Sequence, residues 1–155
     1  MRTIIIGLGN PILTDDSVGV KVARALKDGF KGEVDITELY AGGIRLMDAM
    51  TGYERALIID SVITDGRVPG GIFHFTPSDL LTTRNTVSTH DMNLPTALEM
   101  GRMLGIPLPS EIRIWGIEAG DAETFGEGLT EDVAKAVPVV VEEIRQYLSV
   151  GGSEK

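Results

Sequence analysis

Two aspartates and one histidine stand where a metal ion or a reacting group could be held. Asp16 follows the first predicted strand, Asp60 ends an apolar run, and His90 comes just before a predicted helix. In sheets of parallel strands, ligands bind beyond the carboxyl ends of the strands, so these positions are where chemistry is expected. Two carboxylates and one imidazole form an open site suited to a borderline divalent metal such as nickel or zinc. These three are the candidate catalytic and metal-contacting residues, although spacing alone does not show that they converge.

Each of the three also has a structural interpretation that the sequence leaves open. Asp16 can cap the next helix and still face the strand edge, and Asp60 can be a turn residue bonded to nearby backbone N–H groups. His90 can be a polar loop residue, although a helix N-terminus disfavours imidazolium and keeps the ring in the neutral form that ligates metals. Asp15 is interpreted as a structural helix cap, and His74 as an ordinary exposed or half-exposed strand residue. Three further acids compete for a place in the site: Glu118, Asp121 and Glu123.

The glycine-rich loop after the first strand does not match a nucleotide cradle. Gly7-Leu8-Gly9 follows a strand and precedes a helix, as the dinucleotide fingerprint requires, but Ile12 occupies the position of the third glycine. Two aspartates at the helix start would also repel a pyrophosphate. The chain has no Gly-Lys-Ser/Thr, no Gly-x-Ser-x-Gly elbow and no zincin-type helix motif. We therefore expect no nucleotide cofactor and no permanently bound zinc, and a nucleotide-binding regulator is the weaker alternative.

The elements that must position these residues alternate between strand and helix. Short apolar or alternating runs predict strands, and apolar residues at helical spacing predict helices. The predicted strands are 3–7, 33–39, 56–62, 71–76 and 111–117, and the predicted helices are 17–28, 44–50, 92–104 and 130–148. This order predicts an α/β fold with a mostly parallel sheet of about five strands and helices on both faces. Pro138 should kink or split the last helix.

Length, composition and charge narrow the classes of protein. The chain has 155 residues and no cysteine, so we expect one catalytic domain over 1–150, without disulfides or thiolate ligands, and a flexible C-terminal tail over 151–155. With 14 basic and 23 acidic residues, the net charge of −9 disfavours nucleic acid and membrane surfaces as partners. No apolar stretch has the length of a membrane span or the pattern of a signal peptide. A cytoplasmic location is the default expectation.

Three segments together resemble the hydrogenase maturation endopeptidase family. Residues 6–20 read IGLGNPILTDDSVGV, residues 57–62 read LIIDSV, and residues 88–94 read STHDMNL. The first segment is the most specific, and the resemblance covers nearly the whole chain. One segment departs from the family, whose members often carry an acid and a Gly-Gly-Thr-like turn after the second strand. Here that stretch reads ELYAGGI, and Glu38 stands in for the acid.

The resemblance implies a fold, an activity and a site. The implied fold is a single three-layer α/β/α domain with a twisted sheet. The implied activity is one endoproteolytic cut that removes the C-terminal extension from the large-subunit precursor of a nickel–iron hydrogenase, after the metal centre has been loaded. The family's metal-contacting positions fall on Asp16, Asp60 and His90, and the nickel that they contact is supplied by the substrate.

The sequence leaves the chemical step and the class of function open. The metal could act as a Lewis acid, or a carboxylate could be the general base for water. A non-enzymatic nickel-sensing or docking chaperone could use the same three side chains. A peptidase with a different target, such as one with the related spore germination protease fold, is a further alternative.

Overall fold

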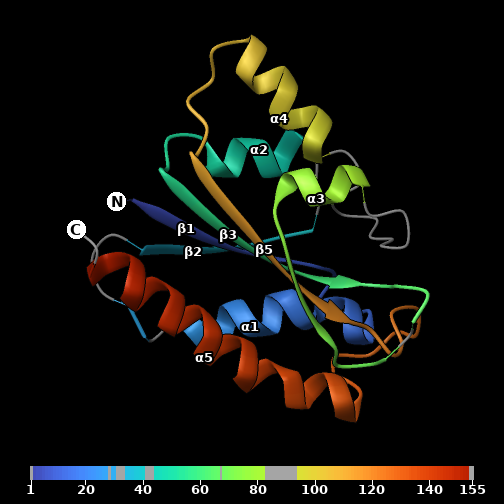
Figure 1. The fold of residues 1–155 in the computed structure, drawn as a ribbon. Helices are drawn as coiled ribbons and strands as arrows, with labels where there is room; N and C mark the ends of the chain where they lie inside the picture. The colour runs from blue at the N-terminus through green and yellow to red at the C-terminus, as the bar shows by residue number, and fades with distance from the viewer. Residues whose placement is uncertain are drawn as a thin grey trace.

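The computed structural model describes residues 2–27, 29–30, 34–40, 44–66, 68–82 and 94–153, which build one five-stranded sheet with helices on both faces (Figure 1). The strand order is β2-β1-β3-β5-β4. The first four of these pair in parallel, and β4 is an antiparallel edge strand. The strands are β1 (Thr3–Leu8), β2 (Val34–Leu39), β3 (Arg55–Val62), β4 (Ile72–Phe75) and β5 (Glu111–Glu118). The predicted α/β fold with a mostly parallel sheet of about five strands is confirmed.

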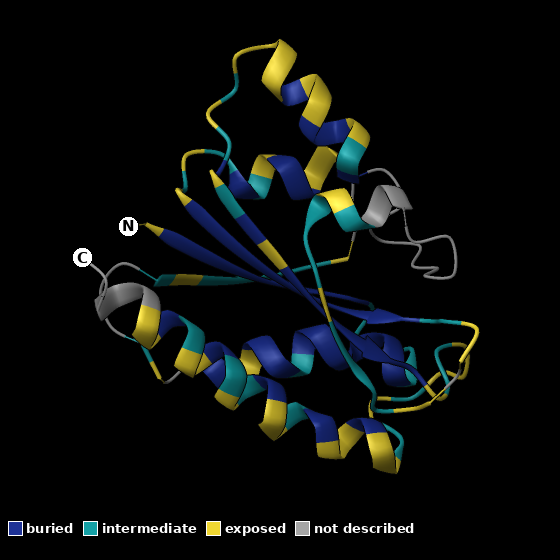
Figure 2. Cartoon of the chain, viewed as in Figure 1, coloured by how far each residue is buried: buried dark blue, intermediate teal, exposed yellow. Residues whose placement is uncertain are grey.

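The central strands are apolar along their whole length because helices cover both of their faces. Every residue of β1 and β3 is buried (Figure 2). Successive side chains of a strand point to opposite faces, so a doubly covered strand needs a continuous apolar run rather than an alternating one. In β1, Ile5 packs into one core while Ile4 and Ile6 pack into the other. The same division separates Leu57 from Ile58 in β3.

Two groups of helices form the outer layers. Helices α1 (Val18–Leu26) and α5 (Glu131–Ser153) cover one face, and α2 (Ile44–Met50), α3 (Pro77–Thr82) and α4 (Leu94–Met103) lie on the other (Figure 1). A short 3-10 helix, η1 (Thr14–Ser17), leads from the loop after β1 directly into α1. The sheet between two helical layers confirms the three-layer α/β/α architecture. It also leaves the loops at the strand ends as the place for a site.

Two helices differ from their predicted form. Helix α3 was not predicted, because its six residues are too few to show a helical apolar period. Helix α5 runs without interruption through Pro138, so the helix is not split there, and a kink at Pro138 stays a prediction. Pro138 is exposed, and buried Val133, Ala136 and Val140 on the opposite side hold both halves of α5 against the sheet.

Helix α5 also continues to Ser153, three residues into the segment that the sequence predicts to be a tail. Pro95 occupies the second position of α4, where the missing N–H has no intrahelical role. Among the described residues, no helix is both long enough and apolar enough to span a membrane.

Candidate active site

Among the described residues, four buried carboxylates lie at the carboxyl edge of the sheet. Asp15 and Asp60 have no exposed surface, Glu118 is 1% exposed and Asp16 is 8% exposed. Because β1, β3 and β5 run in parallel, the residues that follow or end them gather at this one edge. Burial of a carboxylate is costly unless hydrogen bonds or opposite charge compensate for it. The partners of each acid therefore show what it does.

Asp16 and Asp60 are joined through a single residue, Ser61. The Ser61 hydroxyl donates to Asp16 Oδ1 at 3.1 Å, and the Ser61 backbone N–H donates to Asp60 Oδ1 at 2.8 Å. The other oxygen of Asp16 accepts the backbone N–H of Asn10 at 2.8 Å. The structure thus brings two of the three predicted site residues to one place. His90, the third, lies outside the described residues.

Glycines allow the Asp16 loop to lie this close to the strand ends. A Cβ at Gly9, which has φ of 147°, would meet the backbone oxygen of Asp16 at 2.0 Å. A Cβ at Gly19 would lie 2.2 Å from the backbone oxygen of Ile59 and 2.4 Å from that of Leu8. Only glycine fits at either position, so the Gly-x-Gly loop serves close packing of backbone against backbone. The start of α1 is thereby held against β1 and β3, next to Asp60.

Asp15 has a structural role that differs from the predicted helix cap. Its carboxylate accepts the backbone N–H groups of Gly120, Asp121 and Thr130, each at 2.8 Å, and the Thr130 hydroxyl at 2.7 Å. The prediction of a cap for the next helix is wrong, since η1 and α1 begin without a side-chain cap bond. Asp15 instead fixes the loop between β5 and α5. These partners lie more than 100 residues away in sequence, which local patterns do not reveal.

The competing acids are also bound to neighbouring loops. Glu118 accepts hydrogen bonds from the backbone N–H of Thr64 at 2.9 Å and from its hydroxyl, and so anchors the loop after β3. Asp121 accepts the backbone N–H groups of Glu123 and Thr124, both at 3.0 Å. The Thr124 side chain, followed by these two N–H groups, lowers the pKa of Asp121 below its ordinary value. Glu123 is exposed.

Glu38, at the end of β2, belongs to an ion-pair network with α1. Arg24 donates to it through Nε and Nη2, both at 3.1 Å, and Lys27 Nζ lies 3.2 Å away. The hydrogen bond from Arg24 is the largest of the effects that hold the pKa of Glu38 below its ordinary value. Glu38 therefore ties β2 to α1. The stretch 41–43 that follows it lies outside the described residues.

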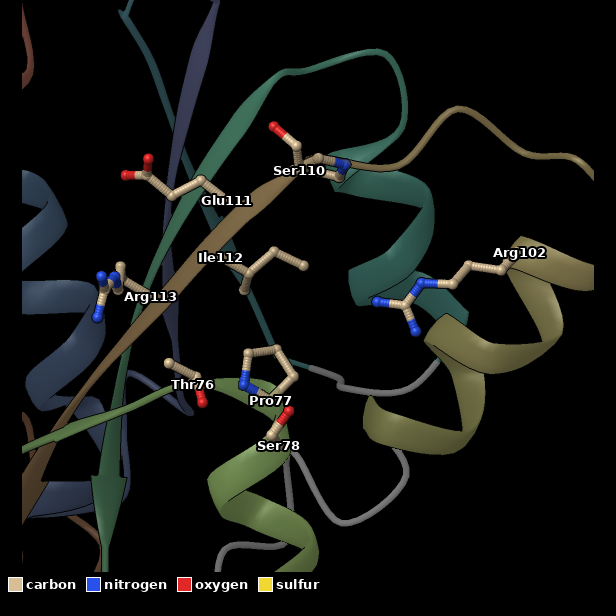
Figure 3. Close-up of a pocket in the computed structure, with 9 residues that line it drawn as sticks. Thr76, Pro77, Ser78, Arg102, Ser110, Glu111, Ile112 and Arg113 are labelled. Atoms are coloured by element: carbon tan, nitrogen blue, oxygen red, sulfur yellow. The ribbon is translucent and has the colours of Figure 1, made fainter.

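The other features of the described residues lie away from this edge. His74 is exposed, as predicted, and its Nε2 lies 2.7 Å from Glu143 Oε1 on α5. A pocket of about 270 Å³ opens at the amino end of β5, between α3 and α4 (Figure 3). Within the described part of the chain, no group of three or more His, Cys, Asp or Glu side chains converges as a metal site.

Ser61 is the site residue that the sequence does not single out. Its position directly after Asp60, in the segment LIIDSV, is the only local signal. In a strand, neighbouring residues point to opposite faces, so Ser61 uses its N–H toward one aspartate and its hydroxyl toward the other. The hydroxyl thereby ties the Asp16 side chain to the end of β3, one residue after Asp60.

Known proteins are similar to this chain in both fold and sequence. The family model described as HycI, hydrogenase maturation protease, matches residues 20–147. The chain is 25% identical over 157 residues to the hydrogenase 2 maturation protease of Escherichia coli K12, covering 99% of this chain and 94% of that protein. The maturating endopeptidase HybD from E. coli superimposes with a TM-score of 0.84 and 25% identity, over 98% of this chain and 94% of the other.

A second solved structure, the [NiFe] hydrogenase maturation protease HybD from Thermococcus kodakarensis, gives a TM-score of 0.77 at 27% identity, over 95% of this chain and 99% of that one. The chain belongs to the hydrogenase maturation protease family. Its class is therefore that of an endopeptidase, a hydrolase that cuts a protein during the maturation of hydrogenase.

Proposed function

We propose that this endopeptidase removes the C-terminal extension of a nickel–iron hydrogenase large-subunit precursor once nickel has been loaded, and that Asp16, Asp60 and His90 contact that nickel. The observation that carries the proposal is the pair of buried carboxylates bonded to Ser61 at the carboxyl edge of the sheet. Two neighbouring carboxylates repel one another, and a divalent cation between or beside them relieves that repulsion. The substrate's own ion is the cation that this arrangement would recognise.

The donor chemistry fits nickel that is already held by the precursor. Carboxylate and imidazole suit a borderline divalent metal, and thiolates of the precursor would occupy the remaining coordination positions. His90 completes the set in this proposal, on the strength of its place in the segment STHDMNL, four residues before α4 begins at Leu94. Because these side chains would contact the metal centre only when nickel is present, cleavage would follow only after nickel has been loaded. A few-hundred-fold preference for loaded precursor needs about 3–4 kcal/mol of differential binding.

The cut itself is a hydrolysis. Water attacks the scissile carbonyl carbon, the C–N bond breaks, and the leaving nitrogen takes a proton. Two roles suit the residues present: the nickel ion polarises the carbonyl as a Lewis acid, or one aspartate accepts the proton of the attacking water. Both roles need the aspartates in their carboxylate form, so cleavage should be lost on acidification in either case.

The experiment that tests the function is a comparison of two substrates. Purified protein is mixed with nickel-loaded and with nickel-free large-subunit precursor, and the products are weighed by mass spectrometry. We expect the loaded precursor to lose its C-terminal extension and the nickel-free precursor to stay intact. Equal cleavage of both would refute nickel recognition. Nickel-dependent binding without any cleavage would favour the docking chaperone.

A further inference from the structure

The loops that follow β1 and β5 are joined into one surface beside Asp16. The backbone N–H of Thr14 donates to the carbonyl of Gly126 at 2.9 Å, and the N–H of Gly126 donates to the carbonyl of Ile12 at 2.8 Å. A third backbone bond runs from Asp15 N–H to the carbonyl of Asp121 at 2.8 Å, next to the bonds of the Asp15 carboxylate. Residues of the two loops are therefore held at fixed positions relative to one another.

Two large apolar side chains stand exposed on this surface: Ile12 at 48% and Phe125 at 78%. A parallel β-bridge pairs Leu13 with Gly126, so the residues that precede them, Ile12 and Phe125, come to neighbouring positions across the two loops. We call this pair the apolar patch. Hydrogen bonds hold the loop of Phe125 in place, so its ring stays exposed to water. Contact with a partner would remove this apolar area from water, which is favourable.

The apolar patch is continuous with the candidate active site. The N–H of Asp16 donates to the carbonyl of Leu13 at 2.9 Å, and the Asp16 carboxylate accepts the N–H of Asn10. Ile12 lies between these two contacts in the chain. A polypeptide seated at the Asp16–Asp60 pair therefore has the apolar patch within reach of the residues next to its scissile bond.

The charge around the patch indicates what kind of segment it fits. Glu123 and Glu127, each two residues from Phe125, are exposed. The chain as a whole carries a net charge of −9. An apolar side chain with basic neighbours complements this surface in both respects, because the ring removes apolar area from water and the acids attract the cationic groups.

We infer that Ile12 and Phe125 dock the precursor polypeptide, by burying one apolar side chain that lies close in sequence to the scissile bond and is flanked by basic residues. The inference deepens the proposed function and rests on it. Phe125 is assigned a role in substrate affinity and specificity, not in the bond-breaking step. The patch binds the loaded and the empty precursor alike, while the aspartates distinguish between them.

The test is the steady-state cleavage of nickel-loaded precursor by Phe125→Ala and by a matched control, Met103→Ala. Met103 is 79% exposed, like Phe125, but lies on α4. We expect Phe125→Ala to raise KM about tenfold with kcat unchanged, because an aromatic anchor at an interface carries much of the affinity. Phe125→Leu should recover most of the loss, and Met103→Ala should match the wild type. An unchanged KM for Phe125→Ala, or an equal rise for Met103→Ala, overturns the inference.

Binding measurements keep this result separate from the proposed function. Calorimetric titration with the nickel-free precursor measures the affinity that the apolar patch contributes, in the absence of cleavage and of any nickel contact. We expect Phe125→Ala to weaken this binding about tenfold and added salt to weaken it further, as basic flanking residues require. If the wild type binds but does not cut the loaded precursor, the proposed function fails while the docking result stands. If the wild type and Phe125→Ala bind the nickel-free precursor equally, the docking inference fails by itself.

Discussion

The two ends of the central sheet bury opposite charges. At the carboxyl edge, the described residues bury four acids, Asp15, Asp16, Asp60 and Glu118, whereas at the amino edge they bury one base, Arg55. Arg55 donates through Nε to the hydroxyl of Thr3 at 3.1 Å. Its Nη1 lies 3.9 Å from Oε2 of Glu111, so a carboxylate of the same chain pairs with its charge.

The acids at the carboxyl edge divide into two kinds. Asp15 and Glu118 accept hydrogen bonds from the loops that they anchor, and their purpose is structural. Asp16 and Asp60 instead both accept hydrogen bonds from Ser61, Asp16 from its hydroxyl and Asp60 from its backbone N–H. Burial of a carboxylate at the predicted edge therefore does not by itself identify a site residue, because Asp15 and Glu118 are buried there and bind loops.

The largest expected effect is the loss of cleavage in Asp60→Asn and Asp16→Asn. Asparagine keeps one oxygen, which can accept the bond from Ser61, so the fold should survive while the carboxylate is lost; Asp16→Asn also loses the bond from the Asn10 N–H. We expect the kcat/KM on nickel-loaded precursor to fall at least about 100-fold, as removal of a catalytic carboxylate or metal contact typically does. Thermal unfolding by circular dichroism confirms that the variants are folded.

Glu118→Gln is the matched control, since it removes a buried acid of the same edge that is bound to Thr64. It should keep cleavage within a few fold of the wild type. If both asparagine variants keep full activity, or if both unfold, Asp16 and Asp60 have a structural role like that of Glu118.

Asp15→Ala should have the largest effect on stability. It leaves three backbone N–H groups and a hydroxyl without their acceptor, and each orphaned donor costs about 1–3 kcal/mol, less where water can enter. We expect the free energy of unfolding in urea to fall by about 3–4 kcal/mol, with Asp15→Asn less affected. A stable but inactive Asp15→Ala protein would place Asp15 with the reacting residues instead.

Arg55→Met tests the opposite end of the sheet. The substitution keeps apolar volume but removes the bond to Thr3, so the free energy of unfolding should fall by about 1 kcal/mol. Cleavage should not change, because Arg55 begins β3 and Asp60 lies near its carboxyl end. The measurements are urea unfolding and kcat/KM on loaded precursor. A loss of activity without a loss of stability would show that the amino edge takes part in function.

Glu38→Gln should have the smallest effect, and one that depends on pH. The folded-state pKa of Glu38 lies below its ordinary value, chiefly because of the bond from Arg24. The stability from this network is therefore complete above the unfolded pKa and is lost as the pH falls through the folded pKa. Since Arg24 and Lys27 are half exposed, we expect about 0.5 kcal/mol at pH 7. Unfolding curves at pH 7 and pH 3 check this, and an equal difference at both would contradict it.

The strands could be predicted from sequence because each has a local signature. The continuous run Ile4-Ile5-Ile6 and the run ending at Ile59 mark β1 and β3 as doubly covered. The predicted ranges, 3–7 and 56–62, each differ from the observed strand by one residue at one end. Helix α2 begins and ends where its spacing predicts. Helix α5 was harder, because the packing of Val133 and Val140 on the sheet outweighs the local cost of Pro138.

The site was predictable in part for the same reason. A parallel sheet brings the ends of β1 and β3 to one edge, so Asp60 and the loop that carries Asp16 are expected near one another from the topology, and Gly9 and Gly19 let that loop lie close. The hydrogen-bond partners of the buried acids do not follow from the sheet topology. Asp15 bonds to Thr130, far along the chain, and Ser61 joins the two aspartates through side-chain orientations that only the folded chain determines. The place of His90 in the site stays a prediction.

The most direct test of the central claim is the affinity of the enzyme for loaded against empty precursor. Titration calorimetry gives the ratio of the two dissociation constants for the wild type and for Asp60→Asn. If the aspartate pair recognises the substrate's nickel, the wild type should prefer the loaded precursor by a few hundred-fold, about 3–4 kcal/mol, and the variant should lose nearly all of that preference. An equal ratio in both proteins would contradict the account.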